Sequence, residues 1–353
     1  MTHVKPLCSV FGQCGGCEYQ DISYQDELTI KEKLLKAILN KEDIDVELVM
    51  ERIVASPKHY HYRNRLDLRV QRTKTSGILV GFTPPPARVK VSEDKFGILP
   101  IDECPIAMEP INRVIAQLRK EAVGNLPPKY YRANIVVRSD EAGHVRYGGI
   151  GRKSCQLRSD DYFSTIINGR KIFYSLDTFF QANLSILPKL FEVIGAFKIW
   201  GQQTSLYDLY GGVGLFTVGL YDLAGKITLI EESPASITVA RHNISVNNLK
   251  NIEIIESKVE DKLEELLKVD QSKNKVAFID PPRVGLSRGA REFLTVQKNI
   301  GHLLYLSCNP EALAGDLKAL LNGGWALKKI VPFDFFPRTK HLEVLALLEK
   351  NNM

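Results

Sequence analysis

The chain has 353 residues, and its 44% hydrophobic and 25% charged content is typical of a globular protein with room for two or three domains. Its formal net charge of +6 favours a polyanionic partner but is equally compatible with an ordinary solvated surface. No apolar run reaches the roughly 18 residues of a membrane span, and the N-terminus has no apolar signal core, so we expect a cytoplasmic protein with no membrane partner. In a reducing compartment, six cysteines are better explained by metal binding or catalysis than by disulfides.

The first predicted domain, residues 1–59, is a loop followed by a helix. Residues 1–20 contain three cysteines and two adjacent glycines, which favours a loop. Residues 22–40 place apolar side chains near helical spacing and are predicted to form a helix.

The second predicted domain, residues 60–180, has the pattern of an antiparallel sheet. Leu66, Leu68 and Val70 alternate with charged residues, as in a half-buried strand. Further elements are three short strands and one helix, predicted over residues 78–82, 135–138, 144–147 and 110–122. The pattern predicts a central α+β domain.

The third predicted domain, residues 181–353, alternates apolar strands with amphipathic helices. The strands are predicted over residues 205–209, 226–231, 252–255, 276–280, 303–307, 327–333 and 342–348. Helices are predicted between them, for example over residues 187–199, 234–246 and 310–321. This alternation predicts an α/β fold with a mostly parallel, doubly wound sheet. The last two strands are joined by a short loop and are expected to pair antiparallel, and we place the domain boundary within residues 170–185.

A glycine-rich loop follows the first strand of this sheet and opens a helix. It reads Asp208-Leu-Tyr-Gly-Gly-Val-Gly, and its glycines let the backbone approach a ligand closely. Glu231 ends the next strand, where an acidic residue accepts hydrogen bonds from ribose hydroxyls, and Glu232 is an alternative. These residues alone favour NAD and S-adenosylmethionine equally, and a plain tight turn remains a third interpretation.

Two further motifs lie at strand ends. Ser307-Cys308-Asn-Pro310 places a thiol on a turn at the edge of the sheet, although a structural thiol is the better interpretation of a lone cysteine. Asp280-Pro-Pro-Arg283 follows the fourth strand, where folds of this class bind ligands. Its prolines form a stiff floor, and Asp280 can accept a hydrogen bond from a base or cofactor. With the glycine loop, these motifs predict an enzyme that bonds covalently to a nucleobase and methylates it.

The chemistry of such an enzyme requires a base beside the thiol. Uracil C5 is a poor nucleophile until a thiolate adds to C6, and a base must later remove the C5 proton. Glu343, just before the last strand, is the candidate, although on its own it would be interpreted as a solvated turn carboxylate.

These motifs resemble those of the RNA uracil-5-methyltransferase family, which uses S-adenosylmethionine, and the resemblance covers essentially the whole chain. It runs through residues 174–183, 208–214, 231, 280–283, 307–310 and 341–343. It implies a Rossmann-like methyltransferase sheet, with Cys308 as nucleophile and Glu343 as proton-abstracting base. It implies a set of cofactor contacts, namely Gln181, Tyr210, Gly212, Glu231 and Asp280. Phe179 resembles an aromatic residue that stacks on a flipped base.

The N-terminal cysteines form a spaced cluster. Cys8, Cys14 and Cys17, with the distant Cys104, fit a four-cysteine metal site, and the intervening glycines allow the chain to wrap around a bulky group. Structural zinc is the alternative, but the gap between Cys8 and Cys14 is wide for zinc. The pattern is similar to the [4Fe–4S] site of the family's iron–sulfur branch, which is favoured here. Four cysteines leave no open iron for radical chemistry, and Cys155 is predicted to be a separate buried thiol.

Residues 60–69 interleave aromatic and basic side chains on a predicted strand. Arg63, Arg65 and Arg69 would then share a face that grips phosphate, with a solvated sheet face as the alternative. We expect a monomer that binds RNA, with 23S ribosomal RNA favoured over transfer RNA because of the cysteine cluster. The competing hypotheses are a non-catalytic iron–sulfur RNA-binding module and an amino-group methyltransferase, neither of which needs both Cys308 and Glu343.

Overall fold

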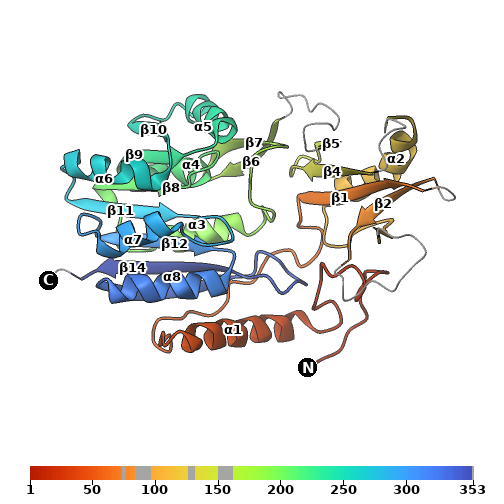
Figure 1. Ribbon diagram of the computed structural model, residues 1–353, viewed down its shortest axis with the longest axis horizontal. Coiled ribbons are helices and arrows are strands. Elements are labelled where there is room, and N and C mark those ends of the chain that lie inside the picture. The colour runs from red at the N-terminus through yellow and green to blue at the C-terminus, as the bar shows by residue number, and fades with distance from the viewer. Residues whose placement is uncertain (74–76, 85–96, 126–131, 150–161, 352–353) are drawn as a thin grey trace.

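The computed structural model describes residues 1–73, 77–84, 97–125, 132–149 and 162–351. Figure 1 shows two sheets side by side, with the N-terminal helix running below the larger one. Among the described residues, no helix combines the length and the apolar character that crossing a membrane requires.

The larger sheet has seven strands in the order β10-β9-β8-β11-β12-β14-β13. These strands are β8 (Gly201–Leu209), β9 (Ala224–Glu231), β10 (Ile252–Glu256), β11 (Asn274–Ile279), β12 (His302–Ser307), β13 (Trp325–Phe333) and β14 (Glu343–Lys350). The first five strands in the sheet order are parallel, and β14 is antiparallel to both of its neighbours. The prediction of a mostly parallel sheet with an antiparallel final pair is therefore confirmed.

The direction of strand addition reverses between β8 and β11, because β9 and β10 lie on one side of β8 and β12 lies beyond β11. Loops that leave the carboxyl ends of two such strands diverge to opposite faces and open a crevice at the sheet edge. The glycine loop and the Asp280 loop begin at this point of the sheet.

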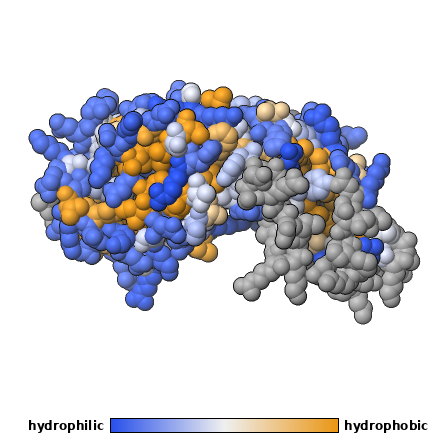
Figure 2. Space-filling view, turned by 90° about the horizontal axis from the view of Figure 1, so that it is seen from above, coloured by the Kyte–Doolittle hydropathy of each residue, from blue (hydrophilic) through white to orange (hydrophobic). Residues whose placement is uncertain are grey.

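Helices cover both faces of the larger sheet. They are α3 (Leu187–Gly195), α4 (Leu215–Gly219), α5 (Pro234–Val246), α6 (Val259–Val269), α7 (Arg288–Val296) and α8 (Pro310–Asn322), and a short 3-10 turn covers Tyr221–Leu223. Leu206 of β8 belongs to the core on one face, and the next residue, Tyr207, belongs to the core on the other. Alternate side chains of a central strand are thus both buried, which is why these strands appear as continuous apolar runs. Figure 2 shows hydrophobic side chains gathered on the surface of the part of the molecule that holds the larger sheet, within a mostly hydrophilic exterior.

The smaller sheet is antiparallel, with the order β3-β2-β1-β4-β5. Its strands are β1 (Arg65–Arg72), β2 (Ile78–Phe82), β3 (Leu99–Pro100), β4 (Arg132–Ser139) and β5 (Val145–Gly149), and α2 (Glu109–Asn125) packs on one face. The central α+β pattern is confirmed. The strand predicted through Tyr60 is wrong at its start: β1 begins at Arg65, because His61 has a φ of +52°, which breaks an extended strand.

A hairpin of β6 (Tyr162–Ile167) and β7 (Arg170–Ser175) was not predicted from sequence. It contacts α5 and α4, and its buried side chains, including Phe163 and Tyr174, join the core of the larger sheet. The predicted domain limits at residues 59 and 180 stay a prediction.

The N-terminal helix, α1 (Tyr24–Lys41), begins where Ser23 accepts a hydrogen bond from the backbone N–H of Asp26. It packs against α8, and its Leu35 and Leu39 are fully buried in the core of the larger sheet. Residues before it contact the connection between β13 and β14, since the backbone N–H groups of Glu18 and Tyr19 donate to the carbonyl of Arg338. The N-terminal segment is therefore joined to the larger sheet both by α1 and by the loop before it.

Candidate active site

The glycine loop is closed by an acidic side chain from the neighbouring strand. The backbone N–H of Gly212, where φ is +53°, donates to Oε2 of Glu231 over 3.0 Å, and that of Ser233 donates to Oε1 over 2.8 Å. Glycine adopts this left-handed conformation without strain. Tyr210 precedes it, also with positive φ, at +62°, and burial raises the pKa of its phenol to about 12. Three predicted cofactor contacts thus meet at one end of β8 and β9.

Asp208, the last acidic residue of β8, is buried behind this loop. Its Oδ2 accepts hydrogen bonds from the backbone N–H and the hydroxyl of Thr217, over 2.9 Å and 2.6 Å. Its Oδ1 has no hydrogen-bond partner among the described residues. Burial raises the pKa of this carboxyl to about 7, against the lowering effect of the two hydrogen bonds. One oxygen of this buried carboxyl is therefore left without a hydrogen-bond partner in the described part of the chain.

Asp280 and Gln181 are brought together from distant parts of the chain. Asp280 follows β11, and its Oδ2 accepts a hydrogen bond from Nε2 of Gln181 over 3.2 Å. The backbone carbonyl of Gln181 accepts from Asn64, which fixes the segment from the side of the smaller sheet. Burial, and then the charge of Asp208, raises the pKa of Asp280 to about 7.

Glu343 is the first residue of β14 and is only 2% exposed. The interpretation as a solvated turn carboxylate is therefore wrong. Burial, and then the neighbouring Asp280, raises its pKa well above the ordinary value. Each of these two neighbouring carboxyls disfavours the ionisation of the other.

Cys308 lies between the end of β12 and the start of α8, at the predicted turn. Asn309 caps the helix by accepting a hydrogen bond from the backbone N–H of Glu311. The thiol is half-buried, and burial, then Glu343 and Asp280, raise its pKa to about 11, whereas Arg283 acts in the opposite direction. The structure thus brings together the predicted nucleophile and the predicted base, and burial raises the pKa of both.

Phe179 is an exposed aromatic residue next to a buried one. Its side chain is 70% exposed, whereas the next residue, Phe180, is 4% exposed and stacks on Tyr174 with ring centroids 4.0 Å apart. Arg138 of β4 is fully buried, and its Nη1 donates to the carbonyls of Ser175 and, over 2.9 Å, of Thr178. Sequence reasoning missed Arg138, because a single arginine in a strand has no distinguishing pattern. Its two bonds fix the turn that presents Phe179.

The three arginines of the predicted RNA face lie on β1 and just before it. Arg65 and Arg69 flank Asp67 on the outward face of β1, and Arg65 pairs with Asp67 over 2.9 Å. Arg63 precedes the strand, donates through Nε to the carbonyl of Arg65, and lines a cavity with the cysteines. Arg69 lines the same cavity, so the shared surface of the three arginines stays a prediction, although Arg63 lies before the strand and not on it.

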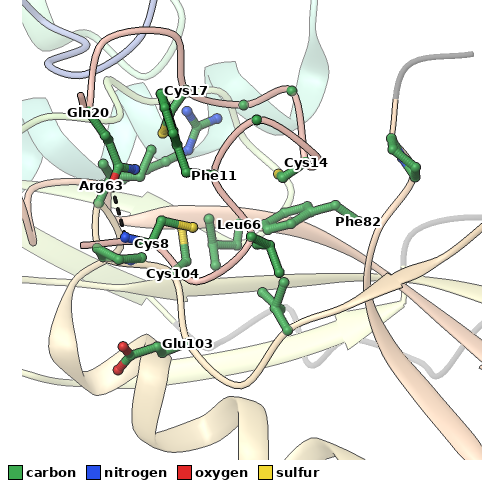
Figure 3. A pocket seen from close by; sticks show the side chains of 18 of the residues that line it. Cys8, Phe11, Cys14, Cys17, Gln20, Arg63, Leu66, Phe82, Glu103 and Cys104 are labelled. Atoms are coloured by element: carbon green, nitrogen blue, oxygen red, sulfur yellow. Dashed lines mark hydrogen bonds between the residues drawn. The ribbon is translucent and has the colours of Figure 1, made fainter. Parts of the chain in front are cut away.

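The four predicted cluster cysteines border one cavity of about 600 Å³, shown in Figure 3. Cys8, Cys14 and Cys17 reach it from the N-terminal loop, and Cys104 reaches it from the smaller sheet. Burial raises the pKa of Cys17 to about 12 and that of Cys104 to about 11. Within the described parts of the chain, no three cysteine, histidine, aspartate or glutamate side chains meet closely enough to hold one metal ion. The remaining cysteine, Cys155, lies outside the described residues.

Comparison with known proteins identifies the family. The model of the tRNA (uracil-5-)-methyltransferase family matches residues 149–351, which is more than half of the chain. The chain belongs to this family. The matched residues include every predicted catalytic and cofactor-binding residue, whereas Cys8, Cys14, Cys17 and Cys104 lie outside the match. The iron–sulfur prediction therefore gains no support from the family match.

Relatives of this uracil-5-methyltransferase family member extend along its whole length. It is 28% identical to a tRNA/tmRNA (uracil-C(5))-methyltransferase of Nautilia profundicola, over 98% of this chain and 100% of the relative. It is 29% identical to an uncharacterized RNA methyltransferase of Aquifex aeolicus, over 98% of this chain and 84% of that protein. The crystal structure of the Pyrococcus abyssi tRNA (uracil-54, C5)-methyltransferase with S-adenosyl-L-homocysteine superposes with a TM-score of 0.70 at 24% identity, covering 96% of this chain and 86% of that one. This likeness establishes the fold.

Proposed function

We propose that this protein is an S-adenosylmethionine-dependent methyltransferase that converts a specific uridine of RNA to 5-methyluridine. The observation that carries the proposal is the meeting of Cys308, Asp280 and Glu343 at the carboxyl ends of β12, β11 and the start of β14. A binding module would have no use for a thiol beside two neighbouring carboxyls at this edge, and an amino-group methyltransferase would have no use for the thiol.

The residues around the glycine loop fit the cofactor. Glu231 is placed to accept from ribose hydroxyls, and Oδ1 of Asp208 is buried without a partner, which suits a donor or a cationic group of a ligand. Gln181 and Asp280 would complete the pocket on the side of the thiol. When bound, S-adenosylmethionine supplies an electrophilic methyl group on a sulfonium centre.

The chain's own residues would carry the other steps. The Cys308 thiolate forms a bond to C6 of uracil, and the electrons of the C5–C6 double bond move to O4 as an enolate. C5 then takes the methyl group. Glu343, as a carboxylate, removes the C5 proton, the double bond re-forms, and the bond between Sγ and C6 breaks to release the thiolate. Phe179 would stack on the target base once it leaves the RNA helix.

The RNA that is modified is proposed from the relatives. The names of two similar proteins specify tRNA or tmRNA, and none of the comparisons reported above specifies ribosomal RNA. We therefore propose transfer RNA as the first substrate to test, in place of the 23S ribosomal RNA that the cysteine pattern favoured. The reaction at C5 is the same for either RNA.

A trapping experiment tests this function. Transfer RNA that contains 5-fluorouridine should form a covalent complex with the protein and cofactor that survives denaturing electrophoresis, because fluorine cannot leave as a proton does. The Cys308→Ser variant should form none. Glu343→Gln should accumulate a methylated adduct on ordinary RNA, because the amide cannot accept the C5 proton. Equal trapping by Cys308→Ser would refute the assigned nucleophile.

We also propose that the cysteine cavity holds a [4Fe–4S] cluster. Four thiols border one cavity of about 600 Å³, which would have room for a bulky cluster. The raised pKa values of Cys17 and Cys104 mean that thiolates are unstable here without a cation. Protein purified without oxygen should be brown and contain about four irons per chain. Stoichiometric zinc without visible absorbance would contradict the cluster.

A further inference from the structure

The negative groups around Cys308 raise the question of what stabilises a thiolate there. Asp280 follows β11, Glu343 begins β14, and both oppose ionisation of the thiol. The start of α8 favours a thiolate only weakly, through the N-terminal end of the helix dipole. A reaction that begins with a thiolate and continues through an enolate needs a positive charge at this position.

Arg283 is the cation whose field favours ionisation of Cys308. Its backbone carbonyl accepts a hydrogen bond from Nδ2 of Asn309 over 2.9 Å, which ties the loop after β11 to the loop that carries Cys308. The same loop is held at its other end, because the backbone N–H of Leu286 donates over 2.9 Å to the buried Asp316. Arg283 thus lies on a loop that is held by hydrogen bonds at both of its ends.

The Arg283 side chain is oriented by a hydrogen bond to a neutral acceptor, the imidazole of His341. Its Nη2 lies 3.3 Å from Nδ1 of His341, and within the described parts of the chain it forms no ion pair with a carboxylate. Burial, then the charges of Arg283 and Arg63, lower the pKa of His341 to about 4, so the imidazole is neutral and Nδ1 accepts. The backbone N–H of His341 donates to Oγ1 of Thr339, which anchors the ring. The guanidinium is therefore oriented without having its charge neutralised.

We propose that Arg283 is a catalytic cation: it stabilises the thiolate of Cys308 and then the enolate oxygen of the uracil adduct, with His341 as the residue that positions it. The second role depends on the proposed function, whereas the first is a property of the protein alone. Three charged groups then act on Cys308: Asp280 and Glu343 oppose ionisation of the thiol, and Arg283 favours it.

The test measures alkylation of Cys308 by the neutral reagent iodoacetamide in the full-length protein, followed by peptide mass spectrometry so that the other cysteines do not interfere. Between pH 7.5 and 9.5 the rate is proportional to the thiolate fraction. Arg283→Ala should lower the rate about tenfold at each pH, which corresponds to roughly one pH unit in the thiol's titration. Removal of a side chain opens the site, so a slower reaction cannot come from reduced access.

Three variants separate charge from structure. Arg283→Lys should keep the rate within about threefold of the wild type, because it retains the charge. His341→Ala should slow the reaction, and His341→Gln, which retains an acceptor, should restore it. Arg288→Ala removes the same charge from an exposed position on α7 and should leave the rate unchanged.

Two results would overturn the proposal. One is an unchanged alkylation rate in Arg283→Ala together with weaker RNA binding and a smaller salt dependence, which would make Arg283 a phosphate contact. The other is an equal loss of rate in Arg283→Ala and Arg283→Lys. Because neither RNA nor cofactor is present in the alkylation assay, its result stands even if the protein fails to methylate uridine.

Discussion

Three carboxyl groups lie at the same edge of the larger sheet: Asp208 and Glu343 are buried, and Asp280, after β11, is half-buried. Each has a raised pKa, with burial as the largest cause, and the charge of each one acts on the next. Carboxyl groups at such positions lower the free energy of unfolding, compared with a variant that has neutral side chains at the same positions. Loss of stability of this kind is common at functional sites. Their presence indicates that this edge of the sheet is built to meet a ligand.

Asp208→Asn should stabilise the protein in a pH-dependent way. The folded-state pKa of Asp208, about 7, exceeds its ordinary value. The stability of the folded protein is therefore least affected by this carboxyl below pH 4, where the group is protonated in both the folded and the unfolded chain, and it decreases as the pH rises through 7. The difference between 3.8 and about 7 corresponds to at most about 4 kcal/mol. The variant's gain in free energy of unfolding should be larger at pH 8 than at pH 5, as measured by urea denaturation. An equal gain at both values would contradict the raised pKa.

Phe179→Ala should reduce methylation without changing the salt dependence of RNA binding. Stacking on a base contributes roughly 1–3 kcal/mol and is insensitive to salt, so single-turnover rates should fall about tenfold or more. Ile166→Ala is a matched control, since Ile166 is 68% exposed and lies on the hairpin. A loss of methylation caused by Ile166→Ala would point to a surface effect unrelated to stacking.

At the scale of elements, β1 has its apolar side chains on one face and its charged side chains on the other. Its apolar residues face α2, while Arg65, Asp67 and Arg69 face outward. The pair between Arg65 and Asp67 partly neutralises this face, so Arg69, which is exposed and has no ion pair among the described residues, is the stronger candidate for a phosphate contact.

Arg69→Ala should weaken binding to many RNAs and reduce the slope of log affinity against log salt concentration by about one. Arg65→Ala should have a smaller effect, because its charge is already shared with Asp67. Affinities measured by filter binding across a salt series will distinguish them. If both variants keep the wild-type slope, this strand is not the RNA face.

Helix α1 is joined to the segment before β14 by a buried charge network. Lys31 is 1% exposed and donates to Oε1 of Glu27 over 2.8 Å and to Oδ1 of Asp334 over 2.7 Å. The backbone N–H of Arg338 also donates to Glu27. This network fixes the start of the segment that leads to His341 and Glu343.

Lys31→Met should lower the free energy of unfolding by about 3–5 kcal/mol, because two buried carboxylates lose their cation. Lys36→Met, a change on the same helix that breaks an exposed pair with Glu47 in the segment after the helix, should change it by less than about 1 kcal/mol. Denaturation in guanidinium chloride at pH 7 measures both. Similar small losses for the two variants would mean that the network contributes little.

At the scale of the whole molecule, the N-terminal loop lies where the two sheets meet. Its cysteines face Cys104 of the smaller sheet, and His341 of the larger one lines the same cavity. The proposed cluster, bound there, would hold the smaller sheet against the edge that carries Glu343. The proposed cofactor contacts, at the ends of β8 and β9, are made by other residues.

Cys14→Ser should therefore weaken RNA binding and lower iron content while leaving cofactor binding nearly intact. Metal binding contributes to the folding of such loops, so its loss should loosen the loop and with it the relation between the two sheets. Calorimetric titration with S-adenosylmethionine and an RNA-binding assay on the same preparation would compare the two affinities. A parallel loss of both would place the cysteine loop in the cofactor site instead.

The sequence alone determined the order of the elements of the larger sheet and the positions of its motifs. Hydrophobic periodicity and glycine placement are local properties, so β8, β11 and β12 and the loops after them could be predicted from neighbouring residues. Burial is not local. It depends on which distant segments pack together, and only the tertiary structure decided that Glu343 is buried beside Asp280, that Arg63 faces the cysteines, and that Arg138 fixes the Phe179 turn. The chemistry of the site depends on these contacts, because the pKa values of its groups are set by burial and by charges from other strands.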